Sequence, residues 1–292
     1  MSRDRWLLLF SVLAVWVIWG STYFAIRITL ESMPPFRMAA LRLGLAGAIL
    51  VGVGWLRGTR LPTRAEWLAC ARVGGLLFLG GNGSVVYAEQ TVSSGLVAIL
   101  VGAVPLWTVI IGRFFGATAT LRQWAGILLG VSGVALLNLG GELGGNPLMA
   151  MILLLGSAGW ALGSVLGHRW PMPSGTMASG AQMIVGAGWL ALASLVTGEQ
   201  QLVEITARSW ACFVYLLTFG SLIAFSAYGY LLKNASLPLA TSYAYVNPVV
   251  AVLLGVFLGN ELFGWREASG LVIILGGVLL INLARYRSSV RA

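Results

Sequence analysis

Polar side chains that could bind a small molecule stand singly inside long apolar stretches of this chain. Tyr243 and Asn247 are four residues apart, so they share one face of a helix. An amide at the middle of a membrane can both donate and accept, which suits the charged groups of a zwitterion or, alternatively, a hydrogen bond between helices. Asn82 is flanked by glycines, which permit close approach by another helix or by a substrate. We expect these three residues to contact substrate.

Tryptophan supplies the apolar surface of the same expected site. Of the 12 tryptophans, several near helix ends are expected to be interfacial anchors, whereas Trp19 and Trp160 lie deeper. Buried aromatic rings pack against flat apolar ligands, and equally against one another. Trp160 has Ser164 one helical turn away. We therefore add Trp19, Trp160 and Ser164 to the substrate-binding residues.

Acid, histidine and cysteine side chains are too few and too scattered for catalysis. The chain has 9 Asp and Glu, 1 His and 2 Cys. We therefore expect no enzyme activity, no metal site and no cofactor. The central thirds of the expected helices contain no acid, and Glu89 and Glu261 fall at helix ends. This pattern disfavours strongly cationic substrates and proton coupling through a carboxylate inside the membrane.

The composition is that of a membrane protein. The chain is 58% hydrophobic and 9% charged, against about 25% charged residues in a soluble domain. Its net charge of +9 comes from basic residues spread between apolar runs, so nucleic acid is not an expected partner. The expected partners are membrane lipid and a small-molecule substrate, and the expected fold class is an all-α integral membrane protein.

Apolar windows separated by short polar breaks predict about ten transmembrane helices. The Arg and Lys bias between alternate loops places both termini in the cytoplasm, with residues 286–292 as a cytoplasmic tail. The expected helices are 6–30, 35–56, 67–88, 92–114, 121–139, 147–167, 177–197, 210–231, 238–259 and 264–284.

The second half of the chain repeats the first at an offset of 143 residues, as between Pro105 and Pro248. Residues 1–140 and 147–285 are therefore expected to be two repeats of five helices each. Because five is odd, the second repeat enters the membrane from the opposite side. Inverted repeats around a central cavity suit alternating access. Pro105 and Pro248 are expected helix breaks or hinges. Ten helices already enclose a core, so we expect a functional monomer.

The order of several motifs resembles EamA-type transporters of the drug/metabolite transporter superfamily. The motifs are Trp19-Gly20-Ser21, Pro35-x-x-x-Ala39-Ala40-x-Arg42, Pro248 and Leu258-Gly259-Asn260-Glu261. The resemblance covers nearly the whole chain and is greatest to the YddG-type aromatic amino-acid exporters. It implies export of small neutral metabolites, including aromatic and other neutral amino acids, across a bacterial inner membrane. The family often carries an acid at the end of the fourth helix, which is missing here. A cationic drug exporter, a membrane-embedded enzyme and a channel are the alternative functions.

Overall fold

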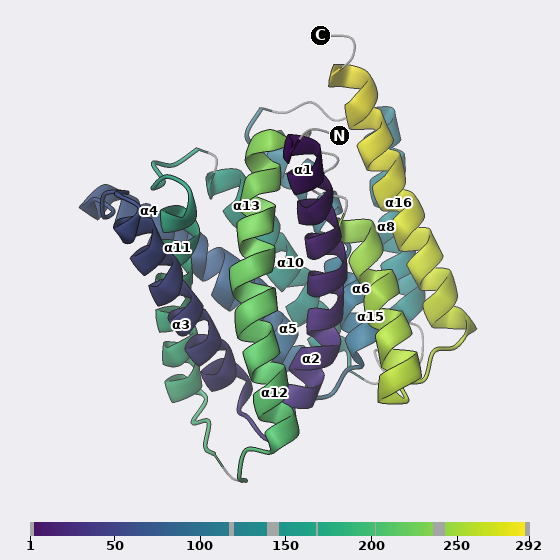
Figure 1. The fold of residues 1–292 in the computed structure, drawn as a ribbon. Helices are drawn as coiled ribbons and strands as arrows, with labels where there is room; N and C mark the ends of the chain where they lie inside the picture. Colours follow the sequence, from purple (N-terminus) through teal and green to yellow (C-terminus); the bar gives the residue numbers. More distant parts are fainter. Residues whose placement is uncertain are drawn as a thin grey trace.

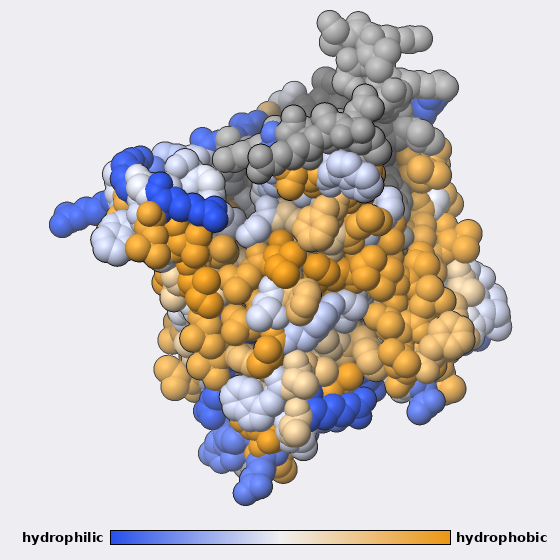
Figure 2. Space-filling view, viewed as in Figure 1, coloured by the Kyte–Doolittle hydropathy of each residue, from blue (hydrophilic) through white to orange (hydrophobic). Residues whose placement is uncertain are grey.

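The computed structural model describes most of the chain, and the description below is confined to residues 3–116, 120–138, 146–167, 169–201, 203–235 and 243–289. Within these ranges every regular element is a helix. Seven helical stretches are long and apolar enough to cross a membrane, and two further apolar helices, Val246–Gly259 and Ala268–Gly277, are shorter. The molecular surface is also that of a membrane-spanning protein, because a broad hydrophobic belt separates hydrophilic residues at the two ends (Figure 2). The all-α membrane fold is thus confirmed.

Three of the membrane-spanning stretches change from α-helix to π-helix and back. The elements of these three stretches are α1 (Arg3–Ala14), η1 (Val15–Trp19) and α2 (Gly20–Leu30); α4 (Arg64–Gly74), η2 (Gly75–Asn82) and α5 (Gly83–Ala88); and α12 (Ala207–Tyr215), η3 (Leu216–Ile223) and α13 (Ala224–Asn234). The remaining helices are α3 (Pro35–Leu56), α6 (Ser94–Val101), α7 (Val104–Phe114), α8 (Leu121–Asn138), α10 (Pro147–Gly167), α11 (Thr176–Val196), α15 (Tyr243–Gly259) and α16 (Trp265–Ser289).

The expected helix boundaries agree with the structure to within a few residues, with one interruption. The stretch expected over 92–114 is divided into α6 and α7 by a turn at Gly102 and Ala103. The start of the helix expected at 238 and most of the linker between the repeats lie outside the described residues.

Two local signals in the sequence explain where particular helices begin. Pro35 starts α3, where its missing N–H is not needed. Thr63 and Glu66 cap α4 reciprocally: the Glu66 N–H donates to Thr63 Oγ1 at 3.3 Å, and the Thr63 N–H donates to Glu66 Oε2 at 2.7 Å. The Arg60 guanidinium donates to the same carboxylate.

The helices form one bundle in which α1 begins and α16 ends at the same end (Figure 1). We call this the terminal end and the other the opposite end. On one side α3 packs along α11, and on the other α8 packs along α16 (Figure 1). Close approach requires glycine: a Cβ on Gly47 would lie 2.8 Å from the Gly180 carbonyl oxygen, and one on Gly180 would lie 3.0 Å from that of Gly47. The α1–α2 and α12–α13 stretches cross the space between the two helix pairs (Figure 1).

Candidate functional site

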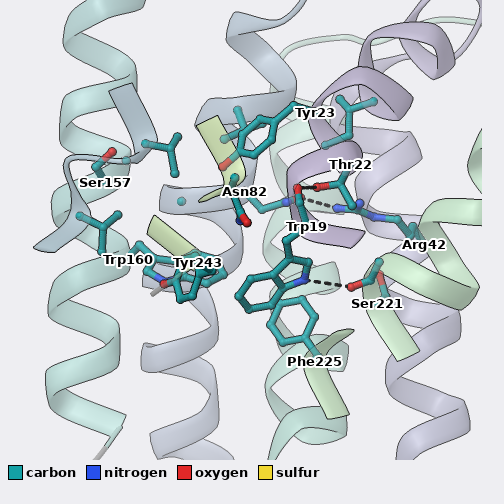
Figure 3. Close-up of a pocket in the computed structure, with 18 residues that line it drawn as sticks. Trp19, Thr22, Tyr23, Arg42, Asn82, Ser157, Trp160, Ser221, Phe225 and Tyr243 are labelled. Carbon is teal, nitrogen blue, oxygen red and sulfur yellow. Dashed lines mark hydrogen bonds between the residues drawn. The ribbon is translucent and has the colours of Figure 1, made fainter. Parts of the chain in front are cut away.

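A small cavity of about 90 Å³ lies inside the bundle, between residues of both halves of the chain. Five of the six residues expected to bind substrate line it, from four different helical stretches: Trp19, Asn82, Trp160, Tyr243 and Asn247. Figure 3 shows the first four of these residues around the cavity. Most of the other lining side chains are apolar, and the polar ones are Thr22, Tyr23, Arg42, Ser157 and Ser221. The cavity therefore offers an apolar wall with a few polar groups, as small-molecule sites do.

The three π-helical segments all contribute to this cavity. Trp19 is the last residue of η1, Asn82 the last of η2, and Ser221 lies in η3. Short π-helical segments recur at functional sites, and their wider turns shift side chains relative to a regular α-helix. One carbonyl of η3 is used across helices, because the Trp19 indole N–H donates to the Gly220 oxygen at 3.2 Å. No periodicity in the sequence predicted these segments.

An aromatic cluster forms one wall of the small cavity. It consists of Trp19, Trp160, Phe225 and Tyr243. The Trp19 ring centre is 5.0 Å from that of Phe225, 5.2 Å from that of Tyr243 and 6.3 Å from that of Trp160. The contacts with Tyr243 and Trp160 are edge-to-face, a favourable arrangement for aromatic pairs.

A large cavity of about 890 Å³ lies on the other side of the aromatic cluster. Trp160, Phe225 and Tyr243 line both cavities and thus separate them. The large cavity reaches exposed residues where α10 and α13 end and α11 begins, among them Arg169 and Asn234. It therefore occupies the terminal end of the bundle.

The structure separates Ser164 from the other five expected substrate-binding residues. Ser164 lines the large cavity, and its hydroxyl donates to the Trp160 carbonyl oxygen at 2.8 Å. It lies one turn beyond Trp160 on α10, nearer the terminal end, and that distance along the helix carries it past the aromatic cluster.

Asn247 makes the interhelical hydrogen bond that the sequence offered as an alternative to substrate contact. With the amide oriented to satisfy both groups, Nδ2 donates to the Trp16 carbonyl oxygen at 3.0 Å and to that of Tyr243 at 3.2 Å. Asn247 is 4% exposed and still lines the small cavity. It therefore joins α15 to η1 at the wall of the site.

The two prolines differ in their surroundings. Pro105 stands in the first turn of α7, directly after the turn that separates α6 from α7. Pro248 lies inside α15, which is continuous from Tyr243 to Gly259, so the structure does not have the helix break expected there. Proline removes one helical N–H without requiring an interruption, and the packing of α15 against α2 and α6 holds the helix in place.

The opposite end of the bundle is closed by contacts between the two halves. The Glu261 carboxylate accepts from the Ser94 N–H at 2.9 Å, the Ser94 hydroxyl at 2.8 Å and the Gly95 N–H at 3.2 Å. Arg27 Nε lies 3.6 Å from the same carboxylate, and Arg27 Nη1 donates to the Val92 carbonyl oxygen at 2.9 Å. A carboxylate at the start of α6 also suits the helix dipole.

Two charged residues that the sequence analysis left out of the site are buried beside it. Arg42 is 4% exposed, lines the small cavity and donates through Nη2 to Asn82 Oδ1 at 2.7 Å. Glu89, just past the end of α5, is 2% exposed, and within the described ranges neither of its carboxylate oxygens has a hydrogen-bond partner. Burial raises the pKa of Glu89 well above its usual value. The Glu261 charge adds to this increase, whereas Arg27 and Arg42 oppose it.

Metal-ligating side chains do not gather anywhere in the described residues: no three of His, Cys, Asp and Glu are close enough to hold an ion. The groups that line the small cavity are aromatic surface, amides, hydroxyls and a guanidinium, and these can bind a small molecule.

Comparisons with known proteins agree with this architecture. The EamA-like transporter family matches residues 6–139 and again residues 147–283. The inner membrane transporter YedA of Escherichia coli K12 is 46% identical over 277 residues, covering 94% of this chain and 90% of that protein. A transporter of Synechocystis is 25% identical over 298 residues, covering 93% and 88%. A solved crystal structure shares the fold, with a TM-score of 0.67 at 22% identity over 97% of this chain and 98% of that one.

Proposed function

Because the chain belongs to the EamA-like transporter family of the drug/metabolite transporter superfamily, we propose that it exports small neutral metabolites across a bacterial inner membrane. Aromatic and other neutral amino acids are the substrates that we favour, as in the YddG-type exporters that the sequence resembles. The inner-membrane location rests on YedA, whose name states it.

The observation that carries this proposal is the aromatic cluster between the two cavities. A flat apolar side chain can stack against Trp160 or Tyr243 from either cavity, because both residues line both spaces. The polar groups that a zwitterion needs, Asn82 and Asn247, are on the small-cavity side. A substrate entering through the large cavity would thus meet an aromatic surface first and polar groups behind it.

Alternating access is the mechanism that this arrangement supports. One cavity reaches the terminal end, while hydrogen bonds and an ion pair close the opposite end. We take this as the conformation that receives substrate from the side of the termini, which the arginine bias predicts to be the cytoplasm. Export then requires the opposite end to open and the terminal end to close.

Contacts between equivalent helices support an inverted repeat. On α8 and α16, a Cβ added to Gly133 would lie 3.2 Å from the Gly270 carbonyl oxygen, and one added to Gly277 would lie 2.5 Å from that of Gly126. In the sequence repeat Gly126 corresponds to Gly270, and Gly133 to Gly277. The same contact therefore occurs twice with the partners exchanged, as a two-fold axis requires. The two separate matches of the family, one in each half, also support two repeats.

Transport by purified protein tests the proposed function. Proteoliposomes loaded with phenylalanine, tryptophan or leucine should exchange the labelled amino acid across the membrane. Trp160→Ala should lower exchange of the aromatic amino acids about ten-fold or more, because stacking contributes about 1 kcal/mol beyond the lost apolar area. Trp210→Ala is the matched control, since Trp210 is 49% exposed and lines neither cavity. If wild-type protein exchanges none of these amino acids, or exchanges only quaternary ammonium dyes, the proposed substrate class is wrong.

A further inference from the structure

Arg42 presents an incompletely paired guanidinium to the small cavity. Nη2 donates to Asn82 Oδ1, but Nε is buried and has no hydrogen-bond partner among the described residues. In the part of the chain that the structure describes, no carboxylate lies within ion-pair distance of Arg42. Arginine has five N–H donors and stays protonated in proteins. A buried guanidinium with only an amide for a partner retains both its charge and unused donors.

Neither of the nearby acids forms an ion pair with Arg42 in the described part of the chain. Glu261 is occupied by Ser94, Gly95 and Arg27. Glu89 makes no hydrogen bond through either oxygen to any residue that the structure describes, and its raised pKa means that the carboxyl group remains protonated over a wider pH range. Leaving a buried charge uncompensated is strongly destabilising, so a site of this kind is best explained by a ligand that completes it.

We propose that Arg42 and Asn82 form a subsite for the carboxylate of the transported molecule, whose apolar part packs against the aromatic cluster. This inference rests on the proposed function and specifies one end of the substrate. With Oδ1 of Asn82 turned to Arg42, the amide Nδ2 remains as a second donor for the same anion. Arg42 comes from α3 and Asn82 from η2, so the carboxylate would link two helices across the cavity (Figure 3).

Charge and size favour a carboxylate over a phosphate. A single guanidinium balances one negative charge and matches the two oxygens of a carboxylate. A phosphate carries about two charges at neutral pH and would need a second cation. Among the described residues, Arg42 is the one Arg or Lys that lines this cavity of about 90 Å³. The same charge opposes cationic substrates, even though the aromatic rings alone would attract them.

Matched pairs of ligands test the subsite. Each pair contains an acid and the corresponding amide: phenylalanine and phenylalaninamide, phenylpropionate and phenylpropionamide, lactate and lactamide. Binding is measured by thermal shift of the purified full chain in detergent, and exchange in proteoliposomes. The variants are Arg42→Met, Arg42→Lys and the control Arg208→Met, which alters an exposed arginine paired with Glu31.

We expect wild-type protein to prefer the acid of a bound pair by about ten-fold or more, because the amide leaves the guanidinium without its anion. Arg42→Met should abolish that preference, and Arg208→Met should keep it. If Arg42→Met does not fold, Arg42→Lys tests the subsite instead. An ammonium cannot reproduce the forked contact of a guanidinium with a carboxylate, so the preference for the acid over the amide should decrease several-fold.

Equal binding of acid and amide by wild-type protein would overturn the subsite, as would a preference that survives in the Arg42 variants or a panel in which nothing binds. The two proposals can fail separately. Equal exchange of phenylalanine and phenylalaninamide would refute the carboxylate subsite but keep the amino-acid transporter. An Arg42-dependent preference for lactate or phenylpropionate, without amino-acid exchange, would keep the carboxylate subsite but refute the amino-acid transporter.

Discussion

Glu261 holds the opposite end of the bundle closed, and its replacement should open that end. Its carboxylate accepts three hydrogen bonds from Ser94 and Gly95 at the start of α6, and Arg27 lies beside it. The Glu261→Gln substitution keeps the shape of the side chain but removes the charge and turns an amide N–H toward one of the donors.

The expected effect follows from the number of donors. A hydrogen bond to a charged acceptor is worth about 1 kcal/mol more than one to a neutral acceptor. Three such bonds give an upper limit of about 3 kcal/mol, and because neighbouring effects are not additive we expect about 2 kcal/mol. That energy shifts the equilibrium between closed and open forms about 30-fold toward the open form.

Cysteine labelling measures this shift. Ser157 lines the small cavity and is 2% exposed, so Ser157→Cys reports access to the cavity once Cys70 and Cys212 have been replaced by alanine. A membrane-impermeant thiol reagent added on the side of the opposite end should react about 30-fold faster in Glu261→Gln, in proportion to the open population.

Glu199 provides the matched control at the same end of the bundle. Its carboxylate accepts from the Phe36 and Arg37 N–H groups, both at 2.9 Å, and so caps α3 from the segment after α11. Because α3 and α11 pack along their length, Glu199→Gln should lower thermal stability without changing the labelling rate. Labelling of Glu261→Gln within two-fold of the parent rate, or equal acceleration in both variants, would refute the role assigned to Glu261.

Three further substitutions test the buried groups. Because burial raises the pKa of Glu89, the folded protein holds this proton at pH values where the unfolded chain has lost it. Stability should therefore decrease as pH rises through the raised pKa, and Glu89→Gln should remove that decrease in thermal melts across a pH series. Gly277→Ala should destabilise the protein by about 1–3 kcal/mol, because the new Cβ would lie 2.5 Å from the Gly126 carbonyl oxygen. The control is Gly52→Ala, whose Cβ would meet none of the described atoms within 4 Å, and it should not lower the melting temperature. Asn247→Leu should cost about 1–3 kcal/mol in denaturant unfolding, because the Trp16 carbonyl oxygen on η1 loses its donor from α15. Unchanged stability would mean that the hydrogen bonds of the Asn247 amide do not stabilise the fold.

Much of the site could be predicted because a polar residue inside an apolar helix has few possible partners: another helix or a substrate. Residue type, depth, helical spacing and flanking glycines predict a role for Trp19, Asn82, Trp160, Tyr243 and Asn247, and the structure brings all five to one cavity. Ser164 met the same criteria and lies beyond the aromatic cluster. The sequence indicates how deep a residue lies along its helix. It does not indicate where that side chain lies relative to an aromatic cluster that three other helical stretches help to build.

The membrane class, the all-helical fold and most helix boundaries follow from the sequence by itself, because lipid requires long apolar segments with satisfied backbone groups. Only the tertiary structure determined how the charges are arranged. Glu89 follows the end of an expected helix, where water or lipid headgroups are the ordinary surroundings, and Arg42 lies within the expected helix 35–56. The structure instead buries both, and pairs Arg42 with Asn82 from another helix. The physical reason is that a side chain's environment depends on which helices pack over it, and neither periodicity nor composition records that.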